Sequence, residues 1–137
     1  MYLQEEVVTY EVAKLASEAG FKSFTRSYYM IGDKEPFFVG EAKNWNVHYD
    51  KYSAPTKSLL QKWLRKEKGI YIEVYIDWED SIEYNMIRYS WRMATIYRVG
   101  NQDIGGYYKN ESEEYFDTYE LALEDVLKYA FENWIEI

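Results

Sequence analysis

The most constraining feature of the chain is a segment, residues 53–77, that contains the patterns of a helix, a helix end and a strand in succession. Ser53 or Thr56 can cap the start of the helix, and Gly69 follows its last periodic position, where a left-handed residue ends many helices. From residue 70 to residue 77 apolar and polar side chains alternate, which is typical of a strand with one buried face. This succession predicts a packed α+β domain.

Length and composition place further bounds on the fold. The 137 residues match one ordinary domain, so we expect a single globular domain over residues 1–137. The absence of cysteine excludes disulfide scaffolds, thiolate metal sites and cysteine nucleophiles, and it fits a reducing compartment. The first residues carry acids where a signal peptide needs bases, and no apolar run reaches the length of a membrane span. The sequence therefore predicts a soluble, cytoplasmic protein.

Two further helices and one long strand complete the expected architecture. Helical periodicity occurs near residues 10–19 and 118–134, and Asp117 with Glu120 forms a capping-box pattern at the second of these starts. Residues 87–99 alternate with period two, which favours one long, bent or bulged strand, with a partly helical segment as the alternative. We expect a mainly antiparallel sheet of about four to six strands, packed on one face by three helices near 10–19, 56–68 and 118–134.

Charge is distributed unevenly along the chain. The net charge is −8, and residues 111–137 hold nine acidic side chains against one base. The helix near 56–68 carries Lys62, Arg65 and Lys66 on the side opposite its apolar positions. These three cations are candidate phosphate contacts, although the acidic charge of the whole chain opposes approach to a polyanion.

A second candidate surface lies on the predicted strands. Arg88, Arg92 and Arg98, beside Tyr71 and Tyr75, would form an arginine and tyrosine face of the kind that stacks single-stranded bases. The favoured interpretation is structural, with arginine stems covering tyrosine rings and pairing with Glu73.

The irregular segment 40–52 holds two more candidate binding residues, Trp45 and His48. His48 is the sole histidine and could act as a base oriented by a carboxylate, but no local motif marks a nucleophile for it. One histidine and no cysteine suit neither zinc nor copper. The acids of residues 77–83 lack the order of a calcium loop and are expected at a solvated hairpin end. Phosphate-binding glycine loops are also absent from the sequence, so no cofactor or metal is predicted.

Two blocks of the chain carry a family resemblance. The first block has Ala-Pro-Thr at 54–56, Leu60, Trp-Leu-Arg at 63–65 and Ile-Tyr-Ile at 70–72. The second reads Phe-Asp-Thr-Tyr-Glu-x-Ala-Leu-Glu at 116–124. This combination resembles a group of small uncharacterised proteins of Bacteroides-type gut bacteria and of their phages and prophages. The resemblance implies an accessory protein of a mobile element, and it transfers no catalytic residue.

The sequence therefore favours a non-enzymatic protein that binds another macromolecule, with a protein as the preferred partner. The 16 tyrosines and five tryptophans supply amphipathic rings for either a sheet surface or a binding surface. One alternative is nucleic-acid binding through the basic helix and the arginine and tyrosine face. The other is an enzyme that uses His48 with nearby carboxylates. A concave pocket around His48 would favour the enzyme, and an open loop would favour the binding protein.

Overall fold

The structure is a computed structural model that describes residues 6–99 and 102–133. Contacts between Cα atoms divide the chain into two compact units. The first unit extends to Leu60 and takes in the chain again from Phe131, and the second comprises Gln61–Ala130. The single domain expected from the chain length stays a prediction.

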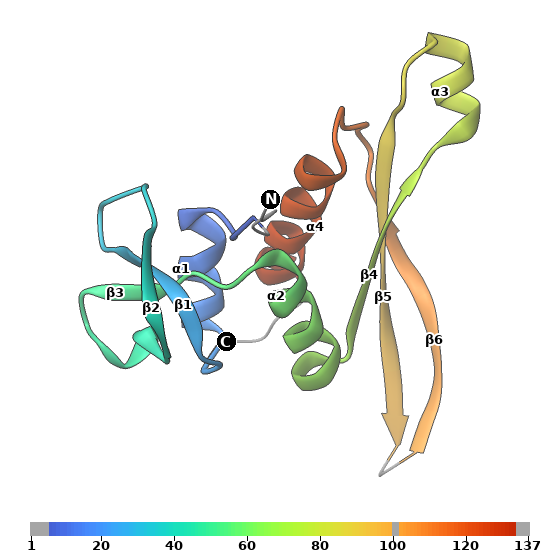
Figure 1. Cartoon of the computed structure of the whole chain (residues 1–137). Helices are drawn as coiled ribbons and strands as arrows, with labels where there is room; N and C mark the ends of the chain where they lie inside the picture. The colour runs from blue at the N-terminus through green and yellow to red at the C-terminus, as the bar shows by residue number, and fades with distance from the viewer. Residues whose placement is uncertain (1–5, 100–101, 134–137) are drawn as a thin grey trace. The chain divides into compact units, whose positions relative to one another are not determined.

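The first unit consists of a small antiparallel sheet with helix α1. Its strand order is β2-β1-β3, so β1 is central and both of its neighbours are edge strands (Figure 1). The elements in chain order are α1 (Tyr10–Glu18), β1 (Thr25–Met30), β2 (Phe37–Lys43), the 3₁₀ turn η1 (Trp45–Val47), β3 (Lys51–Ser53) and the start of α2 (Lys57–Trp63).

Helix α1 begins and ends where the sequence predicts. The Thr9 hydroxyl accepts a hydrogen bond from Val12 N–H at 3.5 Å, and Gly20 follows the helix with a positive φ of 92°. The buried face carries Val12, Ala13 and Ala16, whose small side chains permit close packing. The predicted amphipathic helix near 10–19 is therefore confirmed.

The segment that the sequence left irregular, residues 40–52, is more ordered than expected. Strand β2 continues to Lys43, η1 follows, and β3 begins at Lys51. Asn46 organises the turn, because its amide N–H donates to Phe21 O at 2.8 Å and its amide oxygen accepts from Ser53 N–H at 2.7 Å. Side-chain hydrogen bonds thus hold this segment in place. The sequence analysis relied on hydrophobic periodicity, which this segment lacks.

The second unit is built on the antiparallel sheet β4-β5-β6. Two parts of it were not expected, namely the helix between β4 and β5 and the full length of β6. The elements in chain order are the end of α2, the π-helical turn η2 (Leu64–Lys68), β4 (Ile70–Ile76), α3 (Trp78–Tyr84), β5 (Tyr89–Val99), β6 (Gln102–Glu111) and most of α4 (Tyr119–Asn133).

The predicted alternation in β4 and β5 is confirmed. Ile72 lies opposite Met93 and Val74 opposite Trp91, so these four side chains share one face of the sheet. Met93 and Trp91 are 0% and 3% exposed, which identifies this face as the core face. Strand β5 is one long strand, and its pairing with β6 shifts register at two places, so the favoured prediction of a long, bulged strand is confirmed over Tyr89–Val99.

Helix α4 packs its apolar positions against this sheet. The Trp91 indole N–H donates to Asp125 Oδ2 at 2.9 Å, and the Trp91 ring lies 5.0 Å from the Tyr129 ring. Leu127 and Val126 are fully buried. The predicted helix near 118–134 is confirmed as far as Asn133, and residue 134 lies outside the described residues.

The caps of two helices are settled by hydrogen bonds. Thr56 Oγ1 accepts from Leu59 N–H at 3.2 Å, so Thr56 caps α2 and Ser53 belongs to β3. At α4 the hydroxyl of Thr118 accepts from Leu121 N–H at 3.1 Å. The expected capping role of Asp117 is therefore wrong, since the helix begins one residue later than the capping box implies.

The α+β class is confirmed, but the expected layout of one sheet and three helices is wrong. The described residues form two three-stranded antiparallel sheets and four α-helices. Helix α3 is the one that the sequence did not predict. Periodicity reports which face of a strand is buried, and it does not report which strands pair, so the number of sheets was not accessible from the sequence. Within the described residues, none of the helices combines the length and the apolar content that crossing a membrane requires.

Candidate functional site

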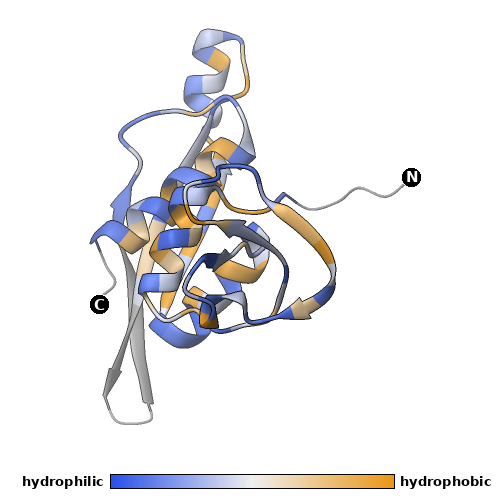
Figure 2. Ribbon diagram, turned by 90° about the vertical axis from the view of Figure 1, so that its left-hand side faces the viewer, coloured by the Kyte–Doolittle hydropathy of each residue, from blue (hydrophilic) through white to orange (hydrophobic). Residues whose placement is uncertain are grey.

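A cluster of exposed apolar side chains lies on α3 and on the residues that lead from it into β5. Residues 77–88 form this projection, here called the α3 knob, at the end of the β4–β5 ribbon (Figure 1). Figure 2 shows hydrophobic colouring on α3 and on the chain that leaves it. The large side chains of the knob and their exposed fractions are Trp78 at 61%, Ile82 at 78%, Tyr84 at 55%, Met86 at 48% and Ile87 at 46%.

The neck of the knob is closed by backbone and side-chain hydrogen bonds. Asp77 N–H donates to Arg88 O at 3.0 Å, which joins the end of β4 to the start of β5. Asp77 also caps α3, because its Oδ1 accepts from Asp80 N–H at 3.0 Å. The two chains that enter and leave the knob are therefore fixed to one another.

Ser81 holds the interior of the knob together. Its hydroxyl donates to Asp77 O at 2.6 Å and accepts from Arg88 N–H at 2.9 Å, and Ser81 is only 5% exposed. Asn85 ends α3 in the left-handed conformation, with a φ of 52°, and Met86 N–H donates to Ser81 O at 3.1 Å. Asn tolerates this left-handed conformation better than most residues, so its presence at position 85 favours the end of α3 at this point.

Arg88, a candidate nucleic-acid contact, is engaged within the same neck. Its Nε lies 3.3 Å from Asp80 Oδ2, an ion pair that lacks hydrogen-bond geometry. Its guanidinium stands 4.4 Å from the centre of the Tyr84 ring and 5.8 Å from that of Tyr115. The negative charge of Asp80, followed by that of Asp77, raises the pKa of Tyr115. Arg88 therefore stabilises the knob through one carboxylate, that of Asp80, and through two tyrosine rings.

Two carboxylates border the apolar side chains of the knob. Glu79 and Glu83 are both exposed, and among the described residues neither forms an ion pair. The knob thus presents a rigidly held apolar surface with negative charge at its rim. Exposed apolar patches of this kind mark interaction sites more often than isolated exposed residues do.

Arg92, another predicted arginine, belongs to the outer face of the sheet. Its guanidinium makes two hydrogen bonds with the Glu73 carboxylate, of 2.8 and 3.1 Å, and lies 5.1 Å from the centre of the Tyr75 ring. Burial, followed by the charge of Glu111, raises the pKa of Tyr75. The expected pairing of an arginine with Glu73 across a tyrosine ring is confirmed.

The basic helix face is exposed at Lys62 and Lys66 and half-buried at Arg65. None of these three cations has an acidic partner among the described residues. They lie on the end of α2 and on η2, and cations are favourable at this end of a helix because its carbonyl groups carry partial negative charge. Lys57 does not belong to the exposed face, since it is 4% exposed and its Nζ lies 3.1 Å from Glu6.

Trp45 and His48 occupy different environments in the first unit. Trp45 is 9% exposed and its indole N–H donates to Thr25 O at 2.8 Å, so its polar atom is already satisfied. His48 is exposed, with its ring centre 6.2 Å from that of Trp45. It lines neither of the two concave surfaces described in this unit. His48 therefore lies at the C-terminal end of η1, open to solvent.

The acids of residues 77–83 lie at the end of the β4–β5 hairpin, as expected, and there they belong to helix α3 and its cap. Asp77 caps α3, and Asp80 forms the ion pair with Arg88. Glu79 and Glu83 are exposed. Within residues 6–99 and 102–133, no group of three or more histidine, cysteine, aspartate or glutamate side chains is arranged to hold a metal ion.

Comparison of the chain with protein-family models, with curated proteins and with solved structures finds no match.

The apolar residues of the α3 knob were missed by the sequence analysis. A signal for them exists, since Asp77 with Asp80 is a cap pattern and Trp78 with Ile82 has helical spacing. The signal was too short to separate from a turn, because seven residues make only two helical turns. Exposure is a tertiary property, so the sequence alone does not distinguish these side chains from core residues.

Proposed function

We propose that this protein binds another protein through the α3 knob and performs no catalysis. The observation that carries the proposal is the exposure of Trp78, at 61%, and of Ile82, at 78%, on a helix whose neck is fixed by Asp77, Ser81 and Arg88. A rigid helix pays little conformational entropy on binding, and tryptophan is enriched among the residues that dominate binding energy.

The charges of the knob define the chemistry of the partner. Glu79 and Glu83 flank the apolar side chains. A complementary surface would be an apolar groove with lysine or arginine at its rim, since opposite charge steers association and like charge opposes it. The partner is therefore a protein with a basic-rimmed apolar groove.

A mobile-element setting for this function rests on the resemblance of residues 54–72 and 116–124 alone. In that setting the chain would act as a small accessory protein that modifies the behaviour of a host or phage protein. The cytoplasm as its location rests on the sequence composition in the same way.

Nucleic-acid binding is the second candidate, and one observation favours it. Lys62, Arg65 and Lys66 lack acidic partners among the described residues, so they are available to phosphates. Arg88 and Arg92 support it less, because each is already held by a carboxylate. The net charge of −8 places this function behind protein binding.

The proposal is tested by capture from an extract of the native host followed by mass spectrometry. Wild-type protein is compared with Ile82→Lys, which places a charge in the apolar surface of the knob. Tyr49→Lys is the matched control, because Tyr49 is 94% exposed and lies in the first unit. We expect a partner that wild type and Tyr49→Lys retain and that Ile82→Lys loses.

A second measurement locates the contact on purified components. With 5-fluorotryptophan in the chain, the ¹⁹F signal of Trp78, assigned by Trp78→Phe, should shift on addition of the captured partner, and that of the buried Trp91 should not. A partner that Ile82→Lys still binds at wild-type affinity would refute the knob as the binding site.

A further inference from the structure

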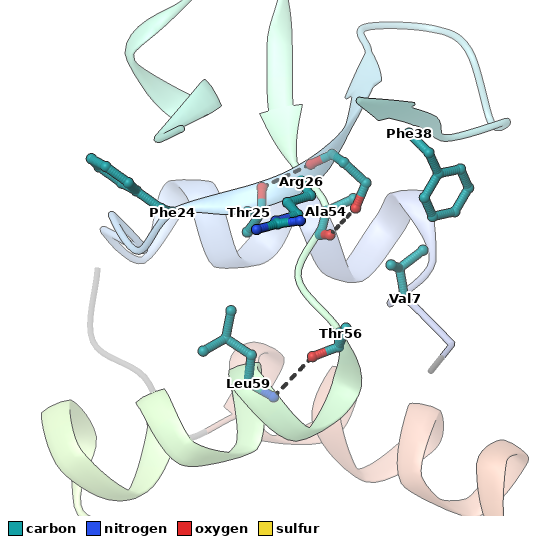
Figure 3. Close-up of a pocket in the computed structure, with 9 residues that line it drawn as sticks. Val7, Phe24, Thr25, Arg26, Phe38, Ala54, Thr56 and Leu59 are labelled. Carbon is teal, nitrogen blue, oxygen red and sulfur yellow. Dashed lines mark hydrogen bonds between the residues drawn. The ribbon is translucent and has the colours of Figure 1, made fainter. Parts of the chain in front are cut away.

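The first unit contains an open apolar groove that is separate from the α3 knob. It has a volume of about 300 Å³ and is lined by residues of β1, β2 and the segments before α1 and α2. Figure 3 shows Phe24 and Phe38 at opposite ends of the groove, with Leu59 on the side of α2. Phe24 is 67% exposed and Phe38 is 55% exposed, so the two rings are open to solvent.

The hydroxyl groups in the wall of the groove bond to the protein itself. Thr25 O–H donates to Ser27 O at 2.8 Å, and Ser27 O–H donates to Ala54 O at 2.6 Å. Thr56 Oγ1 accepts from Leu59 N–H at 3.2 Å (Figure 3). The wall therefore offers a ligand mainly apolar contacts, because the hydroxyls of Thr25 and Ser27 already donate to backbone carbonyls and the Thr56 hydroxyl already accepts from the backbone.

Arg26 is the charged group of the groove. It lies between the two phenylalanines in Figure 3, and its side chain is exposed. Among the described residues no carboxylate pairs with it, although the chain carries 24 acidic residues. A guanidinium beside apolar walls recognises a carboxylate by charge-assisted hydrogen bonds.

We propose that this groove binds an extended peptide segment in which an apolar side chain stands next to an acidic residue. The apolar side chain would lie between Phe24 and Phe38, and the carboxylate would pair with Arg26. The open form of the groove favours a peptide, because sites for small molecules enclose most of the ligand surface. This inference goes beyond the proposed function, since it gives the chain a second binding surface and hence the capacity to bridge two proteins.

The test uses fluorescein-labelled pentapeptides in a polarisation titration. Each carries one phenylalanine or leucine with glutamate one or two positions away, and each has a matched peptide with glutamine in place of glutamate. We expect the acidic peptides to bind more tightly than the matched ones. Arg26→Gln should weaken acidic binding by about fivefold to tenfold and should leave the glutamine peptides unchanged.

Three further variants locate the site. Lys22→Gln removes another exposed cation of the first unit and should change nothing. Phe38→Ala should weaken acidic and neutral peptides alike, because it removes apolar contact. Ile82→Lys should bind the peptides as wild type does, which separates this groove from the α3 knob. All variants carry exposed substitutions, and unchanged melting curves verify their folding.

Several results would overturn the inference. Absence of binding by every acidic peptide up to millimolar concentration would do so, as would equal affinity for the acidic and glutamine forms. Binding that Arg26→Gln leaves intact, or that Ile82→Lys abolishes, would place the contact outside the groove. Each of these results leaves the partner capture by the knob unaffected, so the two proposals fail independently.

Discussion

At the scale of the residue, aromatic side chains serve the core more than the sequence suggests. Tyr29 is 4% exposed and its hydroxyl donates to Val8 O at 2.6 Å, and the indole groups of Trp45 and Trp91 likewise donate to protein acceptors. Buried rings with a satisfied polar atom combine a large apolar contact with a fixed orientation. The abundance of aromatic residues is therefore partly structural, and other rings, among them Tyr49, Phe24 and Trp78, are exposed.

The raised pKa of Tyr75 predicts a loss of stability at alkaline pH. Because burial, followed by the charge of Glu111, raises this pKa in the folded state, the unfolded chain loses the phenolic proton first. The stabilising contribution of Tyr75 to the free energy of unfolding is complete below the pKa of the unfolded chain, about 10. It declines as pH rises through the pKa of the folded state. Urea unfolding at pH 8.5, 10 and 11 should show a steeper decline for wild type than for Tyr75→Phe.

Tyr49→Phe provides the control for this experiment, since Tyr49 is 94% exposed. Its alkaline decline should equal that of wild type. Equal slopes for wild type and Tyr75→Phe would contradict the assigned environment of Tyr75.

At the scale of the element, local hydrogen bonds define structure where periodicity is weak. Helix α3 has seven residues, too few to be stable by propensity alone, and it depends on Asp77, Ser81 and Asn85 at its ends and neck. Helix α4 has 15 residues and an apolar side that packs on β5, and it was predicted from sequence for that reason. Helix α3 is thus stabilised mainly by local hydrogen bonds, and helix α4 by the packing of its apolar side.

Ser81→Ala should open the α3 knob without unfolding the second unit. The substitution leaves Arg88 N–H without its acceptor and Asp77 O without one donor, which costs about 1–3 kcal/mol for buried groups. Hydrogen exchange of the Met86 and Arg88 amides should accelerate about tenfold or more. Ser17→Ala in α1 is the control, and unchanged exchange at Arg88 in Ser81→Ala would contradict the role of Ser81.

Leu127→Ala should lower the free energy of unfolding by about 2–5 kcal/mol, because Leu127 is fully buried and the substitution leaves a cavity. Leu121→Ala on the same helix removes the same atoms from a side chain that is 56% exposed, and it should change stability by about 0.5 kcal/mol or less. Urea denaturation of both variants makes the comparison. Similar losses in the two would show that α4 does not pack as described.

At the scale of the whole molecule, the chain combines two compact units with a net charge of −8. The first unit offers the groove with Arg26, and the second offers the α3 knob and the basic face. The proposed binding surfaces differ in charge, so under the proposed function they would recognise different partners. The overall negative charge reduces non-specific association with nucleic acid.

The basic face gives the test of the nucleic-acid alternative. We expect wild type to show no binding to labelled single-stranded or duplex DNA or RNA at low salt, because the whole chain is acidic. Reversal of Lys62, Arg65 and Lys66 to glutamate should then alter only stability, by about 1–2 kcal/mol, since acids are unfavourable at the end of a helix. Micromolar, salt-sensitive binding by wild type that the triple reversal removes would instead support the alternative.

The sequence by itself determined the features that depend on local chemistry. The limits of α1, the presence of helices α2 and α4 and the alternating faces of β4 and β5 follow from spacing along the chain. The pairing of an arginine with Glu73 follows from spacing across two neighbouring strands. Caps and amphipathic periods act over three to seven residues, and so they are visible in a short segment of sequence.

Only the tertiary structure decided the features that depend on distant partners. The division into two sheets, the helix α3 and the burial of Trp45 and Lys57 each depend on residues far away in the chain. The same holds for the lack of a carboxylate beside Arg26 within the described part of the chain. Trp78 and Trp91 belong to the same residue type, yet one is 61% exposed and the other 3% exposed. The difference arises because other parts of the chain pack over one ring and not over the other. The hydrophobicity of a residue does not indicate whether distant residues will cover it.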